Sequence, residues 1–346
     1  MKNKLFKNVI FNNIYEILLI ITPLITAPYI SRVLHPEGVG IYSYTLSLVT
    51  YFVMLSALGT SNYGTREIAR YRDDKKIYSK KFWEIEFMTI VSSFVSLSIW
   101  IILSIVYKEY RIYLLVLSFC ILGSCFDIKW LYAGLEKFKY TVLVNSLFKI
   151  LSIFLIFIFV KTENDVLTYI LIYSISNFLG SLSMWIFLPK IVCKSKIELS
   201  SLKVNFKETL IYFIPSIATT IYTVLDKTLI GLITNNISEN GYYEQATKII
   251  NMCKTISFAS INGVTTSRIS FLYKKEDKEE IKNLSSAVLN TNLTLSFGCI
   301  FGIAGVTNYF VPLFFGEGYE FTEYLIYIFS ILIFVGCISN TLGGLY

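Results

Sequence analysis

Five long stretches of this chain carry no charged residue. They are residues 38–65, 87–107, 166–189, 283–316 and 324–346. Each reaches the length of about 20 apolar residues that a helix needs to cross the hydrocarbon core of a bilayer. Hydrophobic residues make up 54% of the chain, which is more apolar surface than a soluble domain of this size could bury. The sequence therefore predicts an all-α, polytopic membrane protein.

Hydropathy predicts about ten membrane-spanning helices. Their approximate limits are residues 9–34, 38–64, 83–107, 112–134, 140–160, 166–189, 208–234, 241–266, 285–310 and 321–344. Most of the 31 Lys and Arg residues fall in the N-terminus and in alternate loops, all on one side of the membrane. The loops on the other side carry only Arg32, Lys108, Arg111 and Lys161. Because cytoplasmic loops are enriched in Lys and Arg, the N-terminus is predicted to lie in the cytoplasm.

Five lysines lie inside apolar segments, where a cation costs at least ~2.5–3.5 kcal/mol on insertion scales. They are Lys129, Lys149, Lys227, Lys248 and Lys254. This cost is tolerable where an ammonium group faces a hydrated interior, so the lysines predict a cavity that accepts something anionic. Lys149 and Lys254 are the strongest candidates because they lie near the centres of their helices. Lys129 and Lys248 lie nearer helix ends and could instead snorkel to the interface.

Three acids share the membrane, namely Glu16, Asp127 and Asp226. They are candidates for ion coupling or gating, through pairs with the lysines that break when substrate enters. Static salt bridges that hold the helices together are an equal alternative. A lone histidine, His35, and six cysteines without CxxC spacing indicate neither a metal site nor a cofactor. The basic loops lack the interleaved aromatic residues of a nucleic-acid binder.

The chain also shows a weak internal repeat at a spacing of about 200 residues. Residues 40–44 align with residues 241–245. Six helices separate the two copies, so the copies share one orientation and predict two parallel-related helical bundles around a central cavity. The predicted division is an N-terminal six-helix bundle at 1–190, a cytoplasmic linker at 191–207 and a C-terminal bundle at 208–346. Only four helices fit into this last segment, so the second bundle is expected to be truncated.

The most specific motifs lie near the N-terminus. The run PLITAPYISRVLHPEGVGIYSY occupies residues 23–44, and LGTSNYGTREIAR occupies residues 58–70. Together they resemble the signature of bacterial oligosaccharide flippases. These proteins handle O-antigen and capsule repeat units and belong to the multidrug/oligosaccharidyl-lipid/polysaccharide exporter superfamily. DIKWLYAGLE at 127–136 and FFGEG at 314–318 are similar to the same family, whereas His35 stands where the family usually has glycine.

The resemblance implies a transporter rather than an enzyme. It would move undecaprenyl-diphosphate-linked oligosaccharide repeat units across the bacterial cytoplasmic membrane by alternating access. Ammonium and guanidinium groups would replace part of the hydration that the diphosphate loses. The candidate substrate-binding residues are therefore Lys149, Lys254, Lys248, Lys227, Lys129 and Arg32. The expected partners are the polyprenyl-diphosphate-linked glycan and membrane lipids, with a polysaccharide polymerase as a further candidate and no nucleic acid.

Other functions compete with this interpretation. A multidrug or cation antiporter of the same superfamily would favour an acidic, aromatic cavity. A membrane polysaccharide polymerase or ligase would need a substantial domain outside the membrane, whereas the predicted outer loops are short. A lipid II flippase would differ only in its glycan. The excess of interior lysines over interior acids favours a carrier of anionic lipid-linked sugar.

Overall fold

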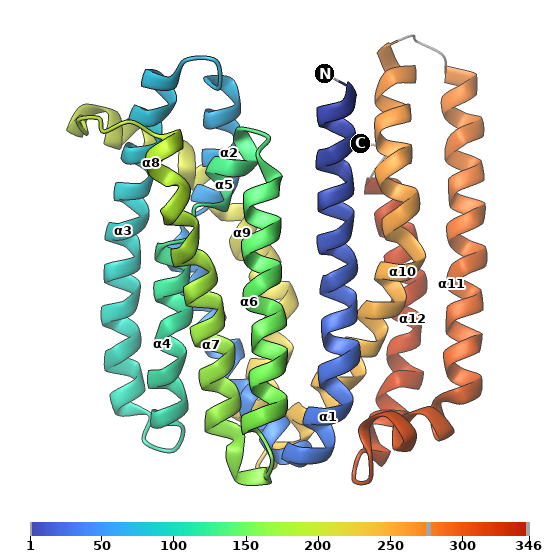
Figure 1. The fold of residues 1–346 in the computed structure, drawn as a ribbon. Coiled ribbons are helices and arrows are strands. Elements are labelled where there is room, and N and C mark those ends of the chain that lie inside the picture. The colour runs from blue at the N-terminus through green and yellow to red at the C-terminus, as the bar shows by residue number, and fades with distance from the viewer. Residues whose placement is uncertain (1, 275–277, 344–346) are drawn as a thin grey trace. The chain divides into compact units, whose positions relative to one another are not determined.

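The computed structural model describes the backbone of residues 2–274 and 278–343, and the side chains of residues 21–198, 201–255, 272, 279–339 and 341. Every regular element in these residues is a helix (Figure 1). The elements are α1 (Lys2–Ala57), α2 (Thr60–Arg70), α3 (Lys75–Val106), α4 (Arg111–Cys125), α5 (Lys129–Gly134), α6 (Phe138–Phe159), η1 (Glu163–Asp165), α7 (Val166–Ser183), η2 (Met184–Phe187), α8 (Leu188–Ile191), α9 (Leu199–Ile233), α10 (Ser238–Lys274), α11 (Lys278–Phe315) and α12 (Glu320–Gly343). Eight helical stretches among the described residues are long and apolar enough to span a membrane. The prediction of an all-α, multi-pass membrane protein is confirmed.

The first helix, α1, bends at His35. This residue has φ 55° and ψ 175°, which lies outside the helical region. Pro36 explains the bend, because a proline ring disfavours the α region for the residue before it and removes one backbone N–H. The predicted loop between residues 34 and 38 is therefore a kink. The first predicted span is one arm of α1, and the second is the other arm continued by α2.

Packing divides the chain into two compact units. Unit 1 comprises Met1–Thr22 and Ile41–Ile237, and unit 2 comprises Pro23–Gly40 and Ser238–Tyr346. The kinked helix α1 therefore contributes residues to both units. The sequence-based division at residues 190 and 208, and the truncation of the second bundle, stay predictions.

In unit 1, α4 packs between α3 and α7, and α7 also packs on α6 (Figure 1). The short helices α2 and α5 meet at Gly64, where a Cβ atom would clash with the ring of Trp130. That ring stacks on Phe82 of α3, with 5.4 Å between the ring centroids. The long helix α9 packs on α2 and α3. Near its C-terminal end, Gly231 gives α9 room to pass the ring of Tyr44 on α1.

Unit 2 is built on α10, α11 and α12, which all pack against one another. Residues 23–40 of α1 join this bundle, with Ala27 in the same buried cluster as Phe315. A polar contact fixes the same arm, since Gln245 Nε2 donates to Ser31 Oγ at 2.7 Å. A close approach of Gly241 to the Pro36 carbonyl, where a Cβ atom would clash, sets the start of α10 against the kink.

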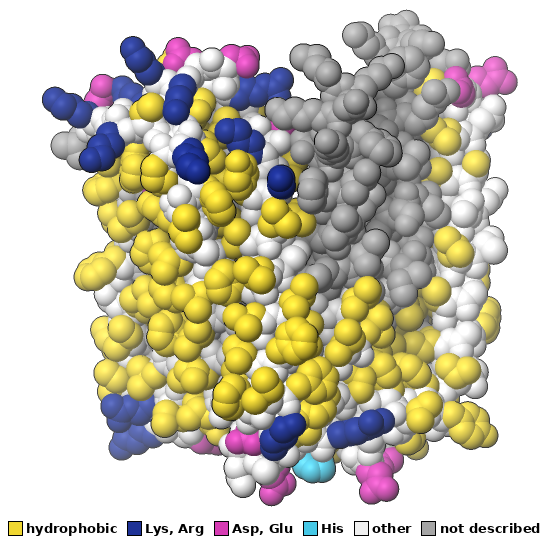
Figure 2. All heavy atoms as spheres, viewed as in Figure 1, with side chains coloured by type: hydrophobic (Ala, Val, Ile, Leu, Met, Phe, Trp, Pro, Cys, Tyr) yellow, Lys and Arg dark blue, Asp and Glu magenta, His cyan; other side chains and the backbone are white. Residues whose placement is uncertain are grey.

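The charges of unit 1 gather at its two ends. Three contacts join neighbouring turns at one end: Arg72 with Glu136, Lys80 with Glu198, and Lys75 Nζ with the Lys190 carbonyl. Lys108 and Arg111 lie exposed in the α3–α4 turn at the other end. Figure 2 shows a broad hydrophobic surface between dark blue groups at the two ends of this unit. Such a belt is expected where helices face lipid.

Candidate functional site

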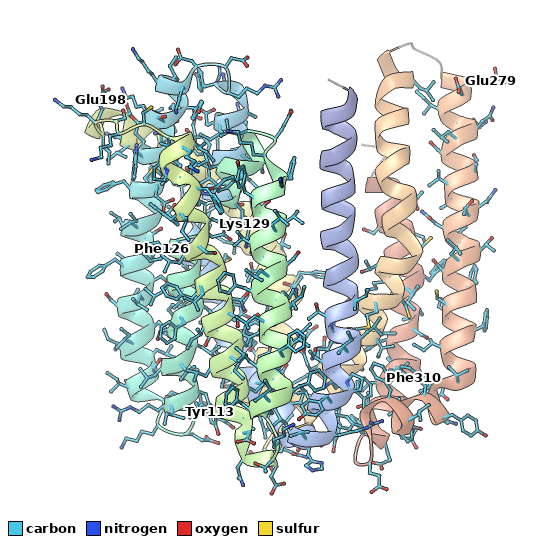
Figure 3. All side chains as sticks on the ribbon, viewed as in Figure 1. Tyr113, Phe126, Lys129, Glu198, Glu279 and Phe310 are labelled. Atoms are coloured by element: carbon cyan, nitrogen blue, oxygen red, sulfur yellow. The ribbon has the colours of Figure 1, made fainter. Side chains whose placement is uncertain are left out.

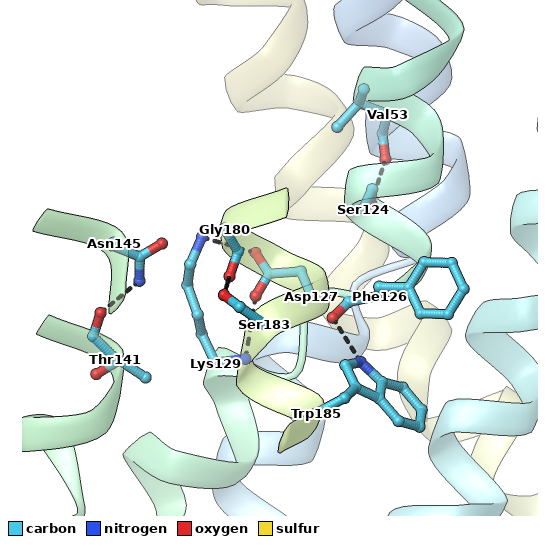
Figure 4. Close-up of polar contacts among 10 residues, drawn as sticks. All are labelled: Val53, Ser124, Phe126, Asp127, Lys129, Thr141, Asn145, Gly180, Ser183 and Trp185. Atoms are coloured by element: carbon cyan, nitrogen blue, oxygen red, sulfur yellow. Dashed lines mark hydrogen bonds and ion pairs between the residues drawn. The ribbon is translucent and has the colours of Figure 1, made fainter. Parts of the chain in front are cut away.

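A break between two helices of unit 1 holds the first candidate residues. Helix α4 ends at Cys125 and α5 begins at Lys129, so the predicted span 112–134 is two helices rather than one. Asp127 lies in this break, one residue before the N-cap Ile128. Its Oδ1 accepts the Lys129 backbone N–H at 3.0 Å, and its Oδ2 lies 2.9 Å from Lys129 Nζ (Figure 4). Trp185 Nε1 donates to the Phe126 carbonyl at 2.9 Å and fixes the same turn. Lys129 therefore forms an ion pair with Asp127, whose carboxylate is partly exposed.

Lys149 lies near the middle of α6 on a stripe of polar side chains. Thr141, Asn145, Lys149 and Ser152 recur along α6 at the spacing that puts residues on one helix face. Asn145 Nδ2 and Ser152 Oγ donate to backbone carbonyls of α6 itself, at 2.7 Å each. The Lys149 side chain is partly buried and its charged neighbour is Lys129, a second cation. Among the described side chains, no carboxylate pairs with the Lys149 ammonium.

The pair of opposite charges on α9 is placed differently. Asp226 is exposed and Lys227 is partly buried, and both make contacts with neighbouring groups. The next residue, Thr228, anchors this part of α9 through its Oγ1, which lies 2.9 Å from Ser47 Oγ and 3.2 Å from the Tyr51 hydroxyl. Both partners lie on the second arm of α1. Asp226 and Lys227 therefore sit on a segment that is held against α1 by buried hydroxyl groups.

Unit 2 holds the other two interior lysines, and they differ. Lys248 Nζ lies 3.3 Å from Glu244 Oε1, one turn earlier on α10, and the Glu244 side chain is only 9% exposed. Lys254 lies further along α10, is partly buried, and has no carboxylate partner among the described side chains. Lys248 therefore forms an intrahelical ion pair with Glu244, whereas Lys254 has no such pair among the described side chains of α10.

Arg32 is tied to the end of α11. Its Nη2 donates to the Leu313 carbonyl, a group that the helix itself leaves unpaired at its C-terminus. The stem of Arg32 also lies against Gly316, which has φ 92° and where a Cβ atom would come within 2.9 Å of Arg32 Cγ. The structure thus gives Arg32 a role in holding the turn between α11 and α12. The side chain of Glu16, the remaining candidate, lies outside the described residues.

Sequence reasoning missed three buried acids of unit 1. Glu86 on α3 is fully buried, and neither of its carboxyl oxygens has a hydrogen-bond partner among the described residues. Asp127 and the Cys125 thiol are the titratable groups that interact with it. A buried polar group without a hydrogen-bond partner is costly, so the Glu86 carboxyl destabilises this part of α3 as it stands. The signal was present in the sequence, since Glu84 and Glu86 open the predicted span that begins at residue 83.

The other two acids, Glu67 and Glu84, belong to a network around Asn205 of α9. Asn205 Oδ1 accepts from the Tyr63 hydroxyl at 2.8 Å and from Lys81 Nζ at 3.0 Å. Asn205 Nδ2 donates to Glu84 Oε2 at 2.9 Å, and Lys81 Nζ lies 3.8 Å from Glu67 Oε2. This network fastens the beginning of α9 to α2 and α3.

Glu198 and Tyr319 lie outside the membrane-spanning helices and have shifted pKa values. A hydrogen bond from Lys80 lowers the pKa of the exposed Glu198 carboxyl in the link before α9, which Figure 3 places at the end of unit 1 opposite Tyr113. Burial raises the pKa of the Tyr319 phenol between α11 and α12. Both groups keep their ordinary protonation state at neutral pH, so neither is a candidate for proton transfer there.

Comparison with known proteins adds to this geometry. The family described as "Polysaccharide biosynthesis protein" matches residues 5–272. The chain belongs to this family. The resemblance drawn from the motifs at 23–44 and 58–70 is thereby confirmed.

Two curated relatives of this family member carry the name "Putative O-antigen transporter". The relative from Escherichia coli (strain K12) is 25% identical over 355 residues, which cover 99% of this chain and 83% of the relative. The relative from Shigella dysenteriae is 26% identical over 216 residues, which cover 60% of this chain and 54% of the relative.

A solved structure is similar to this polysaccharide biosynthesis protein family member over most of its length. It is described as the inward-facing conformation of a multidrug resistance MATE family transporter of the MOP superfamily. The match has a TM-score of 0.67 and 15% identity, and it covers 94% of this chain and 80% of that chain. At this identity the likeness shows a shared fold and leaves the cargo open.

The arrangement in unit 1 can bind an anion. Lys129 and Lys149 bring two ammonium groups within electrostatic reach of each other, and the adjacent carboxylate of Asp127 is 34% exposed. Among these three groups, two positive charges face one negative charge.

Proposed function

We propose that this protein transports lipid-linked oligosaccharide repeat units across the bacterial cytoplasmic membrane for the synthesis of a surface polysaccharide. The carrier lipid is undecaprenyl diphosphate, and the mechanism is alternating access rather than an enzymatic reaction. Membership of the polysaccharide biosynthesis protein family supports this proposal, as do the names of the two curated relatives. The N-terminus faces the cytoplasm in this proposal, in line with the basic residues at one end of unit 1.

The observation that carries the proposal is the pairing pattern of the interior cations. Lys129 and Lys248 have carboxylate neighbours within ion-pair distance, whereas Lys149 and Lys254 have none among the described side chains. A cation retained in an apolar helix without a counter-charge is expensive. A substrate diphosphate is an anion that would offset this cost and accept charge-assisted hydrogen bonds.

We further propose that Asp127 acts in gating. Its bond to Lys129 keeps one ammonium group neutralised until a phosphate competes for it. Asp226 and Glu16 are the other candidates for gating or ion coupling, on the basis of their position in the membrane alone.

The test is the substitution Lys149→Ala in a strain that lacks the chromosomal copy. Losing one charge-assisted hydrogen bond of about 1.5–3 kcal/mol should reduce substrate affinity about 10- to 150-fold. The measurement is the amount of surface polysaccharide together with the lipid-linked oligosaccharide that accumulates on the cytoplasmic side. Lys139→Ala is the matched control, since Lys139 is an exposed lysine in the first turn of the same helix.

Protein abundance in the membrane must be measured in parallel, and Lys149→Arg should keep partial export because the charge is retained. Normal export by the double variant Lys149→Ala, Lys254→Ala at normal abundance would contradict the proposed role of the cations. Loss of resistance to a cationic drug, with unchanged polysaccharide, would favour the antiporter alternative.

A further inference from the structure

Unit 1 carries an apolar groove that is separate from the interior charges. Its volume is about 560 Å³, and it is bounded by the end of α1, one face of α3 and the first turns of α9. Its long wall follows α3 from Phe87 to Ile99. Twelve residues of helix rise by about 18 Å, close to the roughly 15 Å that one leaflet contributes to the hydrocarbon core.

Two small residues form the floor of the groove. Ser92 and Ser96 are spaced by four residues on α3 and let α1 approach closely. Both hydroxyl groups turn inward, since Ser92 Oγ donates to the Ser56 carbonyl at 2.6 Å and Ser96 Oγ donates to the Phe52 carbonyl at 2.7 Å. The floor therefore presents carbon atoms, and its polar atoms are already satisfied.

The wall above this floor is hydrocarbon that the protein leaves uncovered. Val91, Val95 and Ile99 are 48%, 52% and 49% exposed. These residues lie on a membrane-spanning helix, where no water covers them. An extended hydrocarbon chain is the occupant that fits a narrow apolar groove about one leaflet long.

The end of the groove at α9 is cationic. Lys203 lies in the first turns of α9 between Leu202 and Phe206 in sequence, and its side chain is exposed. Glu198, five residues earlier in the chain, pairs with Lys80 at 2.7 Å. Among the described side chains, no carboxylate neutralises Lys203. This end of the groove belongs to the charged end of unit 1, where a lipid headgroup would lie.

We propose that this groove binds an anionic phospholipid of the adjoining leaflet, with one acyl chain along α3 and the headgroup phosphate on Lys203. A zwitterionic lipid would bring its own ammonium group close to Lys203, so it would bind more weakly than an anionic lipid. The isoprenoid chain of a carrier lipid is much longer than this groove and would be left largely uncovered. The bound lipid would bridge α1, α3 and α9.

The experiment is native mass spectrometry of the full chain, stripped of lipid in detergent and titrated with phosphatidylglycerol or with phosphatidylcholine of the same acyl chains. Phosphatidylglycerol should bind as one retained molecule and more tightly than phosphatidylcholine. Lys203→Ala should weaken phosphatidylglycerol binding about fivefold, the effect of one lysine near an anionic surface, and leave phosphatidylcholine binding unchanged. Lys207→Ala is the matched control, since Lys207 is exposed on the same helix but does not line the groove.

A second variant tests the groove itself. Val95→Trp should fill it and abolish the retained lipid, whereas Phe94→Trp should not, because Phe94 is 72% exposed on α3 and lies outside the lining. Equal binding of the two lipids, unaffected by Lys203→Ala and Val95→Trp, would overturn the proposal in favour of ordinary boundary lipid. Preferential retention of undecaprenyl phosphate over phosphatidylglycerol, abolished by Val95→Trp, would also overturn it.

Discussion

The network around Asn205 gives a quantitative expectation for how α9 is attached to α2 and α3. Asn205 is 1% exposed and makes three side-chain hydrogen bonds, to Tyr63, Lys81 and Glu84. In Asn205→Ala, Tyr63 and Lys81 lose an acceptor, but Lys81 stays close to Glu67. Glu84 loses the donor to its Oε2, and its Oε1 already has none among the described residues.

The expected cost follows from this count. A buried charged group that loses its partner costs about 1.5–3 kcal/mol, and the two lost acceptor contacts raise the total to about 3 kcal/mol or more. For a unit of 150–250 residues, each 1 kcal/mol lowers Tm by about 2–4 °C. Asn205→Ala should therefore lower Tm by about 6–12 °C.

The assay is thermal unfolding of the purified protein in detergent at one fixed scan rate, because membrane proteins of this size unfold irreversibly and Tm then depends on scan rate. Asn62→Ala on α2 is the control, since Asn62 is exposed. Glu84→Met should rescue part of the loss in the double variant, because the buried carboxylate that needs Asn205 is then gone. Equal Tm values for Asn205→Ala and Asn62→Ala, or strict additivity with Glu84→Met, would refute the reasoning.

Two further substitutions test buried features of unit 1. Glu86→Met should raise the free energy of unfolding by about 1–3 kcal/mol, because it replaces a buried polar group that has no hydrogen-bond partner among the described residues by an apolar one of similar shape. Thermal unfolding checks this expectation, with Glu109→Met at an exposed site as the control. A lower Tm for Glu86→Met would mean that Glu86 has a partner. Gly231→Ala should cost about 1–3 kcal/mol by overpacking against the Tyr44 ring and should disturb the 3.0 Å contact of its hydroxyl with Tyr107. Gly298→Ala, where a Cβ atom would meet open space, is the comparison in the same assay, and equal Tm changes would speak against the close contact.

The membrane helices could be predicted from the sequence because charge-free length is a strong signal for a bilayer. A loop was expected around His35, whereas the structure has a bend within α1. Pro36, which follows directly, explains the bend. The break at Asp127 was missed because its flanks are apolar enough to read as one span. Only the side chain shows that Asp127 accepts the backbone N–H of Lys129, the first residue of a new helix. The start of α9 was placed at residue 208 rather than Leu199, because its first turns are polar.

The candidate site was less accessible to sequence reasoning. The Glu244–Lys248 pair is an i,i+4 pattern and could have been recognised on the helix. The proximity of Lys129 to Lys149, and the burial of Glu86, depend on how α3, α5 and α6 pack, which hydropathy does not contain. Arg32 was chosen for its charge, and its role in substrate binding stays a prediction. Its contacts with Leu313 and Gly316 join residues far apart in the sequence and could not be predicted.

Because the chain passes between the two units three times, at Thr22–Pro23, Gly40–Ile41 and Ile237–Ser238, any displacement of one unit against the other has to be absorbed at three covalent joints. A proline, a glycine and a short non-helical link stand at these joints. Two of those joints lie on α1, so a substitution in this one helix can change the packing of both units.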